Sequence, residues 1–167
     1  MSEHSAKLIH QFVSPAGVKS IDDWIVKYPA EEKQSAVMSA LTIVQEENGY
    51  LTSEAMDAVA DYLGMSPISV YEVASFYTMY RLKPAGRHSI GICSSISCRL
   101  KGYTSVVNHL ETRLGIKLGE TTSDERFSMR AVECLGACVH APMMQIDKDY
   151  HEYLTPEKID VVLEQYP

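Results

Sequence analysis

The four cysteines of this 167-residue chain are the feature that most constrains its fold. They form two close pairs, Cys93 and Cys98 in "CSSISC", and Cys134 and Cys138 in "CLGAC". All the residues before Cys93 lack a thiol. Thiols that are so sparse and so regularly spaced, as C-x4-C and C-x3-C, indicate a shared chemical task rather than filler in a hydrophobic core.

The amino-terminal stretch "MSEHSAKLIHQF" lacks the long apolar core of a signal peptide, so we expect a cytoplasmic protein. The most apolar run, "AVMSALTIV", is far too short to cross a bilayer, so we expect no direct membrane insertion. Thiols in a reducing compartment rarely form structural disulfides. The cysteines are therefore expected to bind a metal centre.

The first half of the chain is predicted to form four short helices. Ser14-Pro15 and Ser66-Pro67 are typical helix starts, and Gly49 and Gly64 are typical helix ends. None of these helices is long enough to be stable alone, so they must pack together as a bundle. The inward-facing residues are predicted to be Val37, Met38, Leu41, Val44, Met56, Val59, Ala60, Leu63, Val70, Val73 or Ala74, and Tyr77.

The pattern changes after "RLKPAGRH" at 81–88, where Pro84 and Gly86 indicate a linker. The elements expected beyond it are a strand in "HSIGIC", a helix over 103–114, a strand in "RFSMRAVEC", a hairpin that turns at Lys148-Asp149, and a helix from Thr155-Pro156. The order strand–helix–strand, then strand–strand–helix, is the thioredoxin-like arrangement. The chain is therefore predicted to be an α+β protein.

The two cysteine pairs are expected in loops just beyond the ends of two neighbouring strands, at one edge of the sheet. Three interpretations compete: disulfides, one structural zinc ion, or a two-iron cluster. Zinc sites usually show the tighter C-x2-C spacing. The wider intervals here favour a 2Fe-2S cluster, which four thiolates hold with two on each iron. A zinc-binding scaffold remains the structural alternative.

Three stretches, "GRHSIGICSSISCRLKGY", "GETTSDERFSM" and "VECLGACVHAPMMQID", resemble the family of thioredoxin-like 2Fe-2S subunits, the E subunits, of respiratory NADH:quinone oxidoreductase, complex I. "ALTIVQEENGYL" and "VYEVASFYTMY" extend the likeness into the helical half, from about residue 15 onward. It implies an N-terminal helical domain, 1–84, followed by a thioredoxin-like α/β domain, 85–167, that carries one cluster. The implied ligands are Cys93 and Cys98 on one iron, and Cys134 and Cys138 on the other.

The resemblance also implies a function. The chain would be an electron-carrier subunit with no catalytic residue and no complete active site of its own. FMN and NADH would bind a partner subunit, since no G-x-G-x-x-G motif follows a predicted strand here. Further partners would be the other peripheral-arm subunits, at the inner face of the membrane. The corresponding subunit of a soluble NAD-linked hydrogenase or formate dehydrogenase is an alternative.

A rival from another class is an iron–sulfur transcription regulator, because "AVADYLGMSPISVYEVASFY" fits a helix-turn-helix pattern. A DNA reader needs basic phosphate anchors, and no Lys or Arg lies between Gln34 and Tyr80. We therefore expect no nucleic-acid binding, and instead a protein partner for this acidic half. The aromatic residues expected to pack the bundle, or to dock a partner where exposed, are Tyr71, Phe76, Tyr77 and Tyr80.

Overall fold

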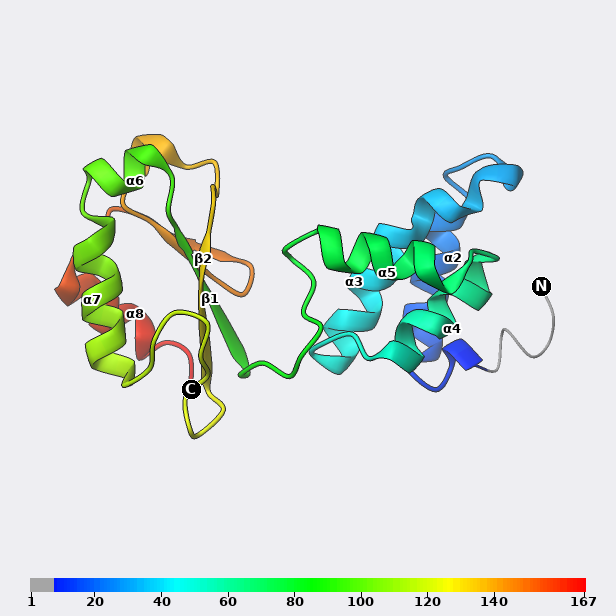
Figure 1. Cartoon of the computed structure of the whole chain (residues 1–167), viewed down its shortest axis with the longest axis horizontal. Coiled ribbons are helices and arrows are strands. Elements are labelled where there is room, and N and C mark those ends of the chain that lie inside the picture. Colours follow the sequence, from blue (N-terminus) through cyan, green and yellow to red (C-terminus); the bar gives the residue numbers. More distant parts are fainter. Residues whose placement is uncertain (1–7) are drawn as a thin grey trace. The chain divides into compact units, whose positions relative to one another are not determined.

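The computed structural model describes residues 8–167, and the chain divides into two compact units between Pro84 and Ala85. The first unit is helical, whereas the second combines a four-stranded sheet with helices (Figure 1). The predicted α+β class is therefore confirmed. None of the described helices is both long and apolar enough to cross a membrane.

The helical unit contains the four helices expected from its start and stop residues and, in addition, one 3-10 helix that was not predicted. They are α2 (Pro15–Ile25), the 3-10 helix η1 (Ala30–Ala36), α3 (Val37–Asn48), α4 (Ser53–Leu63) and α5 (Pro67–Phe76). The hydroxyl of Ser14 accepts from the backbone N–H of Gly17 and caps α2. Gly64 ends α4 with a φ of 68°, a conformation that glycine adopts without strain.

The core of the helical unit consists largely of the residues predicted from helical spacing. Leu41, Val44, Val59 and Leu63 are all buried. The prediction for Tyr77 was wrong, because α5 ends at Phe76 and leaves Tyr77 in an extended conformation, 40% exposed. Tyr80 enters the core in its place and donates its hydroxyl to the carbonyl of Met38 at 2.9 Å. The ring of Tyr80 can turn into the core only because helix α5 has already ended at Phe76.

The second unit is built around a sheet with the strand order β2-β1-β3-β4. Its elements are β1 (His88–Cys93), α6 (Ile96–Leu100), α7 (Tyr103–Leu114), β2 (Phe127–Val132), η2 (Cys138–His140), β3 (Met144–Ile146), β4 (Asp149–His151) and α8 (Pro156–Leu163). Strands β1 and β2 are parallel, whereas β3 is antiparallel to both β1 and β4. The helix between the two parallel strands, α7, is the predicted crossover.

One face of this sheet forms the core of the second unit. Ile90 lies between Met129 and Ile146 in the strand register, and all three side chains belong to one buried apolar cluster. Helices α7 and α8 close that cluster with Leu110 and Ile159. Side chains alternate between the two faces of a strand, so this core uses only the residues on one face. The residues at the strand ends are not needed for it.

The hairpin turns one residue earlier than predicted. Ile146 pairs with Asp149, so Asp147 and Lys148 form the turn and Asp149 already belongs to β4. Asp147 has a φ of 53°, and its carboxylate accepts from the backbone N–H of Ser89 at 2.9 Å. This tertiary hydrogen bond stabilises a turn that local sequence preference alone places elsewhere.

Candidate metal centre

The ends of two parallel strands bring the cysteine segments together. Cys93 is the last residue of β1, and its register partner Val132 is the last residue of β2. Ser94 then bonds twice to the carbonyl of Val132, from its backbone nitrogen at 2.8 Å and from its hydroxyl at 3.1 Å. Both cysteine segments therefore leave the sheet at one end, where α6 also lies (Figure 1).

The two thiols of the first pair are buried and lie close to each other. Cys93 and Cys98 are 2% and 1% exposed, and they pack with Ala141 and Met143. The predicted loop between them is in part a helix, since Cys98 lies in the five-residue α6. One turn of helix brings the chain back toward its start, so the second thiol returns to the first.

Hydrogen bonds make the two buried thiols unequal. Burial raises the pKa of Cys93, but bonds from Ser95, from the backbone of Leu135 and from Cys98 outweigh it and lower that pKa. Burial and the hydrogen bond to Cys93 raise the pKa of Cys98. Hydrogen bonds with the backbone of Met143 and with the side chain of Ser95 lower that pKa, but by less. Of these two buried thiols, Cys93 is thus the one that is more stabilised as the thiolate that binds metals.

The second pair of thiols is exposed and lies on a loop that packs against the first pair. Cys134 follows β2, and Cys138 opens η2. Between them, Leu135 and Ala137 pack against the buried cysteines, and the backbone of Leu135 bonds to Cys93. The second loop therefore contacts the first directly.

The arrangement of the donors suits a two-iron cluster. All four cysteines are free thiols. Within residues 8–167, no three or more His, Cys, Asp or Glu side chains converge on a position for a single metal ion. The thiols form one pair on each of two adjoining segments, and a 2Fe-2S cluster takes two thiolates on each iron.

Two residues near the cysteines make contacts that the sequence does not predict. Tyr150 of β4 donates its hydroxyl to the carbonyl of Leu135 at 2.7 Å. Arg99 donates from its Nε to the carbonyl of Ser94 at 2.9 Å and lies over the ring of Tyr103. Arg99 follows Cys98 directly and is a candidate from the sequence as a charge that stabilises the reduced cluster, whereas only the hairpin brings Tyr150 to Leu135.

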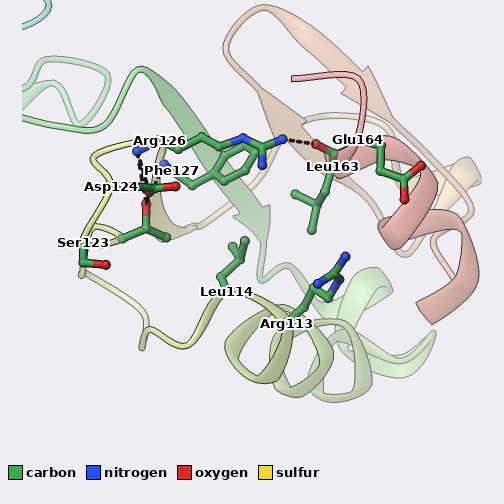
Figure 2. Close-up of a pocket in the computed structure, with 9 residues that line it drawn as sticks. Arg113, Leu114, Ser123, Asp124, Arg126, Phe127, Leu163 and Glu164 are labelled. Atoms are coloured by element: carbon green, nitrogen blue, oxygen red, sulfur yellow. Dashed lines mark hydrogen bonds between the residues drawn. The ribbon is translucent and has the colours of Figure 1, made fainter. Parts of the chain in front are cut away.

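The second unit also contains a cavity of about 280 Å³ that holds no cysteine. Figure 2 shows Arg126 extended along it toward the end of α8. The guanidinium donates to the carbonyls of Tyr166 at 2.6 Å and Leu163 at 2.8 Å, and it stacks on Phe127. Arg126 therefore ties the C-terminal segment to β2.

The predicted helix-turn-helix corner exists as α4 and α5, joined at Gly64–Ser66. Helix α5 contains no Lys or Arg, and its exposed side chains include Ile68 and Phe76. Such a face offers no anchor for phosphates. It is apolar and exposed, as expected of a surface that contacts another protein.

Comparisons with known proteins agree with this geometry. The model of the family described as thioredoxin-like [2Fe-2S] ferredoxin matches residues 21–167. The E subunit of NADH-quinone oxidoreductase from Rickettsia bellii is 44% identical over 145 residues, which are 86% of this chain and 87% of that protein. A second E subunit of the same enzyme, from Rhizobium meliloti, is 43% identical over 148 residues, 89% of this chain and 87% of that protein.

A solved structure shares the fold. A chain of an NAD+-reducing [NiFe]-hydrogenase in the H2-reduced state superposes with a TM-score of 0.66 at 23% identity, over 75% of this chain. This chain spans 22% of that one. At this identity the likeness concerns the fold alone, whereas the family resemblance noted in the sequence is confirmed by the two bacterial relatives.

Proposed function

Because the chain belongs to the thioredoxin-like [2Fe-2S] ferredoxin family and carries that family's one cluster, we propose that it is the electron-carrier subunit of an NADH:quinone oxidoreductase. Relatives that match it over most of their length have the name of the E subunit of that enzyme. The observation that carries the proposal is that the paired strands β1 and β2 end beside each other, and that Leu135 and Ala137, which lie between Cys134 and Cys138, pack against Cys93 and Cys98.

The ligands are Cys93 and Cys98 on one iron, and Cys134 and Cys138 on the other. The supporting contacts are those between the two segments: Ser94 on the carbonyl of Val132, and the backbone of Leu135 on Cys93. Cys93 and Cys98 are buried whereas Cys134 and Cys138 are exposed, so the second pair would hold its iron near solvent. An exposed side is what a carrier needs, since electrons must reach it from another protein.

When bound, a 2Fe-2S cluster accepts and releases one electron at a time. The residues of this chain hold its thiolates and supply hydrogen-bond donors to their sulfurs, such as the backbone nitrogen of Gly136 at 3.3 Å from Cys134 Sγ. Donors of this kind stabilise negative charge on sulfur. No proton transfer is needed in such a role, so the chain requires no general acid or base.

The electron partner is a flavin on a second subunit, where NADH also binds. NADH delivers a hydride, which carries two electrons, so a flavin must divide them before a one-electron carrier can take part. Through the complex, the chain would lie at the inner face of the membrane, together with the other subunits of the peripheral arm.

The helical unit provides a docking surface for that partner at the end of α5. Phe76 and Tyr77 stack edge to face at 5.1 Å and remain 76% and 40% exposed, next to Met79, which is 46% exposed. Glu72 borders this apolar hollow. The partner's matching surface is expected to be apolar with a basic rim.

The ligand proposal is tested by replacing Cys134 with serine. The variant, purified anaerobically, should lose or alter the visible and electron paramagnetic resonance spectra and should contain less iron and acid-labile sulfide. Met143→Leu is the control, because Met143 is a buried sulfur side chain beside Cys93 that is not a proposed ligand. An unchanged Cys134→Ser spectrum would refute the ligand assignment.

The partner proposal is tested by affinity purification of the tagged native complex. The expected partner contains FMN and oxidises NADH, and the complex reduces quinone. Phe76→Asp should weaken the association while the cluster spectrum stays unchanged. Recovery with a hydrogenase or a formate dehydrogenase instead would replace the proposed complex but leave the cluster assignment intact.

A further inference from the structure

Tyr150 reaches from the hairpin to the loop that carries the second cysteine pair. Its hydroxyl donates to the carbonyl oxygen of Leu135 at 2.7 Å, across fifteen positions of the sequence. The ring is 48% exposed, so this bond does not result from burial of the hydroxyl in a core. The contact therefore needs an explanation in terms of the loop that it holds.

The carbonyl of Leu135 belongs to the same peptide group as the N–H of Gly136. That N–H donates to Cys134 Sγ at 3.3 Å. The only cis peptide bond among the described residues is Ala141–Pro142, so the Leu135–Gly136 peptide is planar and trans, with its C=O and N–H pointing in opposite directions. A continuous chain of hydrogen bonds thus runs from the Tyr150 hydroxyl through one peptide to the sulfur of Cys134.

Gly136 adopts the conformation that makes this chain possible. Its φ is 79°, in the region that only glycine enters at little cost. A Cβ added there would meet nothing within 4 Å, so glycine is required for its backbone angle and not for lack of space. On the other side of the same loop, Leu135 packs against the buried cysteines. The peptide is therefore held at both of its ends.

We propose that Tyr150 is a positioning residue that raises the reduction potential of the cluster, by holding and polarising the peptide whose N–H donates to Cys134. The inference rests on the proposed role of Cys134 as a ligand. Reduction adds negative charge to the cluster, so a donor to a ligand sulfur stabilises the reduced state more than the oxidised one. Hydrogen bonds in series strengthen one another by about 10–30% each.

The variant that tests this is Tyr150→Phe, which removes one hydroxyl and keeps the ring. It should load the cluster fully and have a more negative reduction potential. The one-electron reduction equilibrium should fall about two- to tenfold, which is about 18 to 59 mV at 59 mV per tenfold change. The lower figure corresponds to lost polarisation alone, and the upper figure to loss of the N–H···S bond when the peptide rotates.

The matched control is Tyr71→Phe. Tyr71 also donates its hydroxyl to a backbone carbonyl, that of Ser53 at 3.2 Å, but in the helical unit, which contains no cysteine. Both variants and the parent protein are titrated anaerobically, with the reduced cluster followed by electron paramagnetic resonance. Coupling of the cluster to exchangeable protons in H2O and D2O is compared as well, because a weaker N–H···S bond reduces it.

The outcomes separate this inference from the function on which it rests. A normal cluster in Tyr150→Phe, with a lower potential, weaker proton coupling and an unchanged Tyr71→Phe, supports it. An unshifted potential overturns it and leaves the ligand assignment standing, provided that Cys134→Ser alters the cluster. Loss of iron and sulfide from a folded Tyr150→Phe also overturns it, since the tyrosine would then only build the loop. A Cys134→Ser cluster identical to the parent's refutes the ligand assignment on which the inference rests.

Discussion

Glu47 of α3 completes the cap of α2 by accepting two hydrogen bonds from Ser14. Its carboxylate lies 2.7 Å from the backbone nitrogen and 2.8 Å from the hydroxyl of Ser14. In a capping box the acid stands three residues after the cap, but that position is Gly17 here. A Cβ on Gly17 would lie 2.2 Å from Glu47 Oε1, so the glycine leaves room for the distant carboxylate.

Replacing Glu47 by alanine should destabilise the helical unit by about 1–2 kcal/mol, in the range known for helix caps. Glu47→Gln should cost less, because one of its side-chain oxygens is kept as an acceptor. Urea unfolding followed by circular dichroism measures both losses. In a double-mutant cycle, Ser14→Ala and Glu47→Ala should be non-additive, since either change removes the bond between the Ser14 hydroxyl and Glu47, whereas the bond from the Ser14 backbone N–H is lost only in Glu47→Ala. Additive losses would mean that the two residues act independently.

Arg126 should stabilise the second unit through its bonds to the carbonyls of Leu163 and Tyr166. Arg126→Ala is expected to cost roughly 2 kcal/mol, as is usual for hydrogen bonds made by a charged group. Arg113→Ala is the control at the same cavity. Its ion pair with Asp160 is solvent-exposed, so a loss below about 0.5 kcal/mol is expected. Equal losses of stability in the two variants would contradict the role of Arg126 in holding the C-terminal segment.

Stability should fall on the acid side because of His151. Burial lowers the pKa of His151 below its usual 6.5, with Lys158 lowering it further and Asp149 opposing. The folded state therefore binds fewer protons than the unfolded state, and stability declines as pH drops below about 6.5. His151→Gln should flatten that decline in urea midpoints measured between pH 8 and pH 5. A decline in His151→Gln as steep as in the parent protein would contradict this role of His151.

The fragment 85–167 should fold without the helical unit and load its cluster. The division lies between Pro84 and Ala85, and the apolar cluster under the sheet is complete within the second unit. Iron, sulfide and the spectrum of the reduced fragment should match those of the whole chain. A fragment that folds but takes up no iron would show that the helical unit contributes to the centre.

Local patterns in the sequence determined most of the elements and their order, whereas the short helices η1, α6 and η2 were not predicted. Helix starts at Ser14-Pro15 and Ser66-Pro67, and ends at Gly49 and Gly64, were predicted and found, because caps and left-handed glycines act within one turn of the chain. The alternation in "HSIGIC" predicted β1 correctly, because side chains of a strand alternate whatever its neighbours are.

Tertiary structure alone decided the contacts between segments distant in the chain. The register of β1 against β2 places Cys93 beside Val132, and the hairpin brings Tyr150 to Leu135. The hairpin turn at Asp147 depends on the hydrogen bond from Ser89, and the cap of α2 depends on the hydrogen bonds that Glu47 accepts. Except for the register pair Cys93 and Val132, these pairs are joined by hydrogen bonds, and packing rather than sequence spacing chooses all the partners. The ligand residues could therefore be proposed from their spacing, whereas the groups that orient them become visible only once the chain is folded.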